Sequence, residues 1–244
     1  KKGGRICSVQ LKEYLTQDSL PLILFDSDSS SFGILFDTEN NRTINTGELY
    51  FKLNEQKNRN GKKLAMRLYA DADNSGTSNK YIEYQYSLDA ESYMLGCKLN
   101  VVGMSDVIAS NLNEFQLNWA MKIPTQEKDI VTQQQNSTAY FKYLEEDPDY
   151  ISEMNDETKI LDAKTKWVSF KQQFFTSVLI ADNYFDKSGA DISSHNVKFS
   201  FKYVKTLSTN LTIPYAHTPE ESFGMQFYFG PNHFQTLKKF DLGL

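Results

Sequence analysis

The segment Asp71-Ala72-Asp73-Asn74-Ser75-Gly76 comes nearest to a metal-binding motif in this chain. Its first, third and fifth residues carry oxygen ligands, and a glycine stands at its sixth position. A calcium loop of this type also needs a bidentate carboxylate at its twelfth position, which here is Ile82, and Glu83 comes one residue late. The pattern therefore favours a hairpin turn, and we predict no metal site.

Histidine and cysteine could also carry chemistry, and both are few. His195, His217 and His233 are expected in loops or turns, with none beside an acidic residue on a strand. The sequence has no Gly-x-Ser-x-Gly elbow, no phosphate-binding glycine-rich loop and no His-Glu-x-x-His motif. Cys7 and Cys97 are expected as small buried apolar side chains; a disulfide between them stays open, and their spacing does not fit zinc. We predict no catalytic residue and no cofactor.

The apolar run at residues 166–181, whose only charged side chains are lysines, predicts a buried strand region. It contains Trp167, and two glutamines, Gln172 and Gln173, stand at its middle. These glutamines allow two interpretations. They could form a polar floor in an aromatic groove and bind an extended peptide or a glycan. Alternatively, one points to solvent and the other bonds to backbone inside the fold, which we favour.

Period-two alternation of apolar and polar residues indicates the elements that position these side chains. It runs through residues 81–88, 93–101, 115–123, 197–203 and 223–229. Strands with one apolar and one polar face are typical of antiparallel sheets packed on a shared core. Turn-forming residues at 58–61, 73–76 and 186–189 separate the strands. The sequence predicts one domain, residues 1–244, with an all-β antiparallel sandwich.

Two zones depart from the strand pattern. Residues 145–157 carry seven acidic side chains and no basic one, which indicates a solvated loop. Residues 231–242 are predicted as a short C-terminal helix. Pro231 would lie in its first turn, Phe234, Leu237 and Phe240 would share one face, and Gly243 would follow its end.

Composition and charge exclude some functions. The formal net charge is −5, whereas nucleic-acid binding requires a basic face that neutralises phosphates. No apolar run reaches the roughly 18 residues that a membrane-spanning helix needs. We therefore expect neither nucleic-acid binding nor a membrane span within this chain.

Three segments resemble a known protein family. The opening Lys2-Gly3-Gly4-Arg5-Ile6 resembles a Gly-Gly strand start of that family. Residues 165–177 resemble its Trp-hydrophobic-x-x-x-Gln-Gln-aromatic-Phe motif, and Tyr228-Phe229-Gly230-Pro231 with the final residues 241–244 resembles the segment before a membrane helix. On these motifs the chain resembles the periplasmic domain of YidC-family (YidC/Oxa/Alb) membrane protein insertases from Gram-negative bacteria.

The resemblance implies a β-supersandwich similar to galactose mutarotases, standing in the periplasm on the inner membrane. It implies a non-catalytic accessory domain, with membrane helices elsewhere in the parent protein performing insertion. The implied partners are nascent membrane proteins and Sec translocon components, and a surface cleft could hold a peptide or ligand. The residues expected at membrane-proximal or partner contacts are Phe229, Pro231, Phe234, Leu237 and Phe240, and those of the groove or core motif are Trp167, Phe170, Gln172, Gln173 and Phe174.

Three alternatives stay open. The C-terminal helix could dock the domain on a partner or the membrane interface, or simply cap one edge of the sandwich. A mutarotase-like enzyme would need a histidine acid and a glutamate base in its cleft, and we expect that pair to be lost. A carbohydrate-binding module would need outward aromatic side chains, for which Tyr81, Tyr140 and Tyr228 are the candidates.

Overall fold

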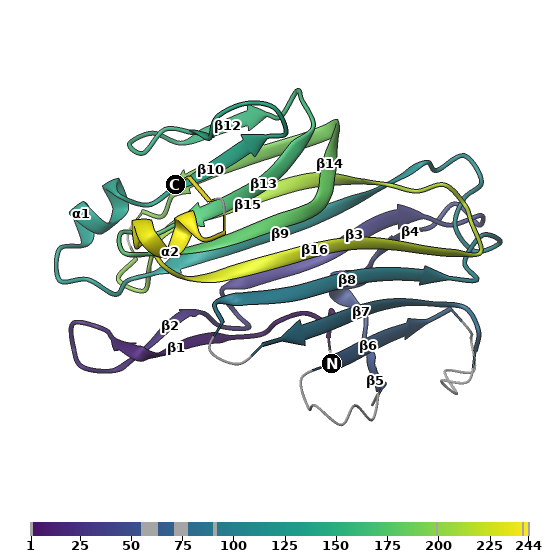
Figure 1. The fold of residues 1–244 in the computed structure, drawn as a ribbon, viewed down its shortest axis with the longest axis horizontal. Helices are drawn as coiled ribbons and strands as arrows, with labels where there is room; N and C mark the ends of the chain where they lie inside the picture. Colours follow the sequence, from purple (N-terminus) through teal and green to yellow (C-terminus); the bar gives the residue numbers. More distant parts are fainter. Residues whose placement is uncertain are drawn as a thin grey trace.

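The structure, a computed structural model, describes residues 2–54, 63–70, 78–89, 92–198, 200–240 and 242–243. Fourteen strands join into one continuous sheet that folds over on itself, and β1 (Val9–Leu15) and β2 (Pro21–Phe25) form a separate hairpin (Figure 1). Every strand pairing in these ranges is antiparallel. The predicted all-β class is confirmed, and so is a short helix near the C-terminus.

One half of the folded sheet, called the β9 layer, is built around the long strand β9. The 3-10 helix η1 (Thr46–Glu48) follows its edge strand. The strands of this layer, in spatial order, are β4 (Thr43–Asn45), β3 (Ser30–Asp37), β9 (Glu114–Pro124), β15 (Tyr203–Pro214), the second half of β14 (Phe175–Asn196) and β12 (Glu157–Ile160).

The other half, called the β16 layer, is wider. It continues through the first half of β14 and ends at two free edges. Its strands, in spatial order, are β11 (Asp149–Tyr150), β10 (Thr138–Tyr143), β13 (Thr165–Lys171), the first half of β14, β16 (Glu220–Pro231), β8 (Met94–Val102), β7 (Tyr81–Leu88), β6 (Lys63–Tyr69) and β5 (Lys52–Asn54).

Strand β14 connects the two layers. Residues Phe175 to Ala181 pair with β16 in one layer, and Asp191 to Asn196 pair with β15 in the other. Between these parts the pairing register shifts, and Gly189 adopts a φ of 62°, which favours glycine. Because Phe185 pairs with Thr165 of β13 and Asp186 pairs with Thr212 of β15, residues 186–189, predicted as a turn between strands, are a bulged bend within β14 just after it changes layers. That prediction was wrong, because a local turn signal cannot distinguish a reversal from a bend.

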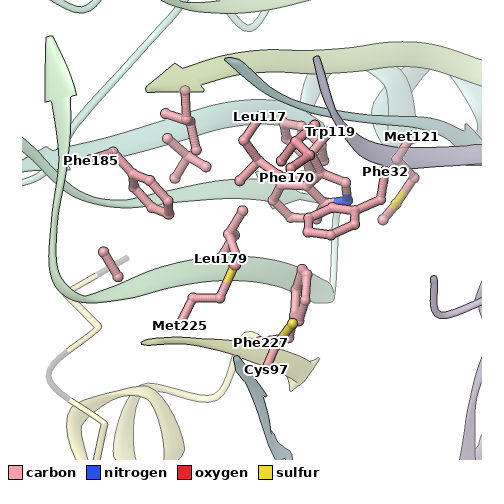
Figure 2. Close-up of a cluster of buried hydrophobic side chains, with 14 of the residues drawn as sticks. Phe32, Cys97, Leu117, Trp119, Met121, Phe170, Leu179, Phe185, Met225 and Phe227 are labelled. Atoms are coloured by element: carbon pink, nitrogen blue, oxygen red, sulfur yellow. The ribbon is translucent and has the colours of Figure 1, made fainter. Parts of the chain in front are cut away.

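Aromatic side chains fill the space between the layers. Trp119 of β9 stacks on Phe170 of β13, with ring centroids 4.0 Å apart, and Phe32 of β3 lies 5.5 Å from Phe227 of β16. Figure 2 shows these rings between strands of both layers, with Leu179 close by. The alternating residues of β9, predicted to share one face, are all buried. The core is thus the contact between the two layers.

The predicted strand at 197–203 is wrong. The link between β14 and β15 occupies most of this range, and β15 begins only at Tyr203. Phe201 is 91% exposed, so its apolar alternation does not mark a buried face. Phe199, the turn at 58–61 and the segment 71–76 with its calcium-like pattern lie outside the described residues.

Two helices complete the described part of the chain. The helix α1 (Ile130–Gln135) was not predicted, because six residues are too few for a periodic pattern; Asp129 caps its N-terminus by accepting from the Thr132 amide. The helix α2 (Phe234–Lys238) is shorter than the predicted range 231–242, since Pro231 is the last residue of β16. The acidic zone at 145–157 is mostly loop, as expected, and includes the two-residue strand β11.

A buried lysine ties the acidic loop to the β9 layer. Lys205 is fully buried, and its ammonium donates to the carbonyl oxygens of Ser137 at 2.6 Å and Glu153 at 2.7 Å. Burial lowers the pKa of Lys205 from 10.5 to about 8, against the opposing effect of the Glu153 and Asp156 carboxylates. The buried charge therefore costs free energy below pH 8, while its hydrogen bonds hold two loops together.

Lys205 predicts how stability changes with pH. Between pH 8 and pH 10.5 the unfolded chain binds a proton that folded Lys205 has lost, so the free energy of unfolding should rise with pH by about 3 kcal/mol from this group. In Lys205→Met this rise should vanish. Urea unfolding of both proteins between pH 8 and pH 10.5 measures this difference. Tyrosine ionisation changes stability in the same range, but it is common to both proteins and cancels in the comparison. Equal slopes for the two proteins would contradict the pKa assignment.

Candidate functional site

Two segments that the sequence singles out separately meet in the structure. The turn between β13 and β14 holds Gln172 to Phe174, and the link from β16 to α2 holds Asn232. The Asn232 amide donates to the Phe174 carbonyl at 2.7 Å, and its side chain donates to the Gln172 carbonyl at 2.8 Å. Asn232 therefore joins both segments into one site.

The helix α2 lies on the outer face of the β16 layer. Leu237 is 2% exposed and packs in a cluster with Trp167, Val178 and Tyr228, which point outward from β13, β14 and β16. The ring of Phe240 lies 5.7 Å from that of Tyr228. This second apolar cluster explains why residues 227–231 at the end of β16 are buried on both faces, where a polar outer face was expected.

A close approach at the end of β16 orients the chain toward α2. The Tyr228 hydroxyl donates to the Pro231 carbonyl at 2.8 Å, and burial raises the pKa of this phenol far above its usual value. A Cβ at Gly230 would stand 2.6 Å from the Tyr228 hydroxyl oxygen, so only glycine fits there. The Tyr228-Phe229-Gly230-Pro231 sequence thus makes a fixed bend between strand and helix.

The five residues expected at membrane or partner contacts divide into two groups. Phe229 points into the core, and Pro231 pairs with Phe175 of β14. Leu237, a residue of α2, is buried between that helix and the sheet. Phe240 is half-buried against Tyr228. Phe234 alone is widely exposed, at 70%. Leu237 and Phe240 therefore pack α2 against the sheet, Phe229 and Pro231 belong to the sheet and its core, and Phe234 is left exposed.

The groove or core motif is likewise divided. Phe170 lies in the interlayer core and Trp167 lies under α2. Gln172 is buried, and its side-chain nitrogen lies 3.5 Å from the Leu24 carbonyl of β2. Gln173 is partly buried, whereas Phe174 is 52% exposed. The backbone contact of Gln172 fits one half of the interpretation favoured above. The other half is wrong, because the side-chain oxygen of Gln173 is buried rather than turned to solvent, as is that of Gln172.

Exposed apolar side chains gather at the end of the molecule next to this site. The tip of the β1–β2 hairpin, α1 and α2 all lie toward the left end in Figure 1. Hydrogen bonds connect these parts: Gln17 donates to the Gln126 carbonyl, Thr125 donates to the Lys202 carbonyl, and Gln172 reaches β2. The apolar end, as we call it, consists of the exposed side chains Leu15, Leu20, Val131, Phe174, Phe201 and Phe234.

Sequence reasoning found Phe174 and Phe234 of this end but missed its other members as contact residues. Leu15 and Leu20 flank the turn between β1 and β2, and Val131 lies in α1. An isolated leucine or valine at a turn carries no sequence signal. Only the fold brings these residues to one end of the molecule.

Within the described ranges, the three histidines lie apart from one another. His195 lies on β14, with its Nδ1 3.9 Å from the Asp156 carboxylate, so its expected loop position away from an acid was wrong. His217 contacts Tyr215 and the Leu112 carbonyl, and His233 precedes α2. No three metal-binding side chains come together among the described residues.

Both cysteines are free thiols. Cys97 is buried on β8, as expected, and burial raises the pKa of its thiol. Cys7 is only partly buried, and its sulfur lies 3.5 Å from the Arg5 carbonyl. The disulfide that the sequence left open is not formed.

The three tyrosines proposed as an aromatic platform do not form one. Tyr228 is fully buried beneath α2. Tyr81 stands on β7 beside Arg67, while Tyr140 of β10 pairs with Tyr150, with ring centroids 5.0 Å apart. The outward orientation expected for Tyr228 was wrong, because α2 covers that face of β16.

The comparisons with known proteins point to one family. The family model described as YidC periplasmic domain matches residues 1–244. A membrane protein insertase YidC of Phocaeicola vulgatus is 35% identical over 97% of this chain and 36% of its own length. The corresponding protein of Parabacteroides distasonis is 33% identical over 100% of this chain and 37% of its own. The chain thus spans little more than a third of these relatives.

Similar solved structures have low sequence identity. A galactose mutarotase related enzyme from Lactobacillus acidophilus has a TM-score of 0.42 and 9% identity, covering 81% of this chain and 82% of its own. A protein from Synechocystis has a TM-score of 0.48 and 10% identity, covering 82% of this chain and 78% of its own.

The packing of α2 predicts how two substitutions differ. Leu237→Ala should lower the free energy of unfolding by about 2 kcal/mol, because it empties a buried site. It should also shift tryptophan emission to longer wavelength, since Trp167 lies under α2. Phe234→Ala, in the same helix but exposed, is the matched control and should change neither. Urea unfolding followed by fluorescence measures both; identical behaviour of the two variants would contradict the docked position of α2.

Proposed function

Because the chain belongs to the YidC periplasmic domain family, we propose that it is the non-catalytic accessory domain of an inner-membrane protein insertase. In this role it aids the insertion and folding of membrane proteins, alone or with the Sec translocon. The match over residues 1–244 is the observation that carries this proposal. Its partners would be nascent membrane proteins and Sec components, contacted through the parent protein.

The placement that goes with this role is the periplasmic side of the inner membrane. Among the described residues, no helix is long and apolar enough to cross a bilayer. Membrane segments of the parent protein would therefore hold this domain at the membrane. Insertion transfers apolar segments from water into lipid and breaks no covalent bond, so the role requires no catalytic group in this domain.

The apolar end supports a specific orientation for the domain. Its six side chains stand exposed at one end, where Lys238 approaches the ring of Phe234 at 5.9 Å and Lys202 neighbours Phe201. Aromatic and aliphatic side chains beside lysines suit the interface of a bilayer with anionic lipids. In this proposal the apolar end faces the membrane, and the packing of α2 fixes the tilt of the sandwich above it.

Substituting the two exposed phenylalanines of the site tests this orientation. In the parent protein, Phe174→Ser with Phe234→Ser should impair insertion of a reporter membrane protein. In this chain alone, the double substitution should weaken binding to vesicles with anionic lipids about tenfold or more. Each phenylalanine contributes binding free energy when its apolar surface leaves water for the membrane interface. Vesicle flotation and a protease-protection insertion assay provide the measurements.

The control for this pair is Tyr50→Ser. Tyr50 is 75% exposed, but it lies in the segment after η1, where it pairs with Lys2 in an isolated β-bridge. Its replacement should leave both assays unchanged. Unimpaired insertion and vesicle binding in the double variant, with a normal melting temperature, would remove the orientation from the proposal.

The membrane association of the native protein tests the role itself. An antibody against this domain should detect a band much heavier than 28.1 kDa that stays in membranes through carbonate washing and is released by detergent. A soluble band near the mass of this chain would instead favour a free-standing, sugar-binding or mutarotase-like sandwich.

A further inference from the structure

A hollow of about 600 Å³ lies between the N-terminal segment and the strands β5 to β8. Residues 4–8 form one wall. The opposite wall is apolar, and the side chains that carry the argument are Leu53, Leu64, Met66, Leu88 and Leu95. Its volume lies within the roughly 300–1,000 Å³ of small-molecule sites in proteins.

The register of the strands explains why this wall is apolar. Leu64 pairs with Tyr86, and Tyr86 pairs with the buried Cys97. Directly paired residues point to the same side of a sheet, so Leu64 faces the core side. Leu53 reaches the same side through its partner Met66, and Leu88 through its alternation with Tyr86.

These core-facing leucines are nevertheless open to solvent. Leu53 is 52% exposed, Leu64 46% and Leu88 47%. The β16 layer extends through β7, β6 and β5, whereas the β9 layer ends at β4, so part of the inner face has no opposing sheet (Figure 1). Among the described residues, the segment 4–8 is the part of the chain that lines the opposite side of the hollow. An apolar ligand bound in the hollow would cover these side chains in the way that an opposing sheet covers the rest of the inner face.

Of the described residues that line the hollow, Arg5 is the one with a charged side chain. Its guanidinium donates to the Ser30 hydroxyl and to the Ser27 carbonyl, both at 2.8 Å, and both partners are neutral. In the part of the chain that the structure describes, no carboxylate pairs with it. A ligand that combines an apolar body with a negative charge therefore complements this site.

The hydrogen-bonding capacity of the hollow selects between two classes of apolar ligand. A peptide would bring a backbone amide and a carbonyl with each residue, and burying them without partners costs free energy. The strand wall offers Tyr86, whose hydroxyl already donates to the Gly4 carbonyl at 3.0 Å. An acyl chain needs no hydrogen-bond partners along its length, and its unbranched methylene groups can pack against leucine and methionine side chains.

We propose that this hollow binds a long-chain fatty acid, with the acyl chain against Leu53, Leu64 and Leu88 and the carboxylate near Arg5. This binding is a property of the 244-residue chain itself and does not rest on the insertion role. Its failure would leave that role untouched, because the two are measured in separate assays.

Fluorescence of cis-parinaric acid tests the proposal. Titrating the chain with this fatty acid should give a saturable rise in emission with one site, reversed by palmitate. Leu64→Glu should weaken binding at least tenfold, because it puts a charge on the apolar wall. The matched control is Leu144→Glu, since Leu144 is 42% exposed and lies outside the hollow. Unsaturable binding, or equal affinity in both variants, would mean surface adsorption only and would overturn the proposal.

The free thiol at Cys7 provides a second readout at the site. Cys7 lines the hollow and is partly exposed, whereas Cys97 is buried. A thiol-reactive dye should label Cys7 in the native chain, and Cys7→Ser should abolish that labelling. Palmitate should slow the labelling several-fold without changing the rate in the Leu64→Glu variant. An unchanged rate in the native chain under saturating palmitate would place the ligand elsewhere.

The role of the charge is separable from that of the apolar wall. Arg5→Gln should weaken palmitate binding and leave hexadecanol binding unchanged, because only the acid carries a charge. Equal losses for both ligands would show that Arg5 supports the wall rather than the carboxylate. Melting curves of Arg5→Gln confirm that the chain is folded under the assay conditions.

Discussion

The shared strand β14 is the constraint on which the rest of the structure depends. Its first half belongs to the β16 layer and its second half to the β9 layer, so the layers are covalently continuous through one strand. The strand changes layers between Phe185, which pairs with Thr165 of β13, and Asp186, which pairs with Thr212 of β15, and Phe185 is fully buried there. With the layers joined in this way, Trp119 and Phe170 meet face to face across the core.

The register of β14 also sets the candidate site. Phe175 pairs with Pro231, and Val178 pairs with Tyr228, so the turn before β14 lies beside the link that leads to α2. A shift of one residue would move Val178 and the other outward-facing residues to the core side and remove the surface that α2 covers. The position of α2, and with it the exposed Phe234, is therefore a consequence of strand pairing in the core.

The sequence predicts the regular parts of this fold well, because alternation reflects burial directly. It places β7 at Tyr81–Leu88 and comes within one residue of each end of β9. Prediction from alternation fails where a residue is buried by something other than the contact between the two layers. Tyr228 is covered by a distant helix, and Glu83, on the polar parity of β7, is buried because Arg67 lies 2.5 Å from its carboxylate and Asn100 donates to it. Phe201 has the alternation of a strand but lies in the link before β15, and it is exposed.

The apolar end and the hollow expose apolar side chains for different physical reasons. At the apolar end, residues such as Leu20 and Phe234 lie at turns and on a helix, where no sheet face demands an apolar side chain. At the hollow, Leu64 and Leu88 obey the core parity of their strands and are exposed because the opposing layer is narrower. Exposed apolar side chains spread over several elements suit a broad, deformable surface such as a bilayer, whereas an apolar wall that lines a hollow suits a ligand that fills it. The same chain therefore offers two apolar surfaces whose shapes select different partners.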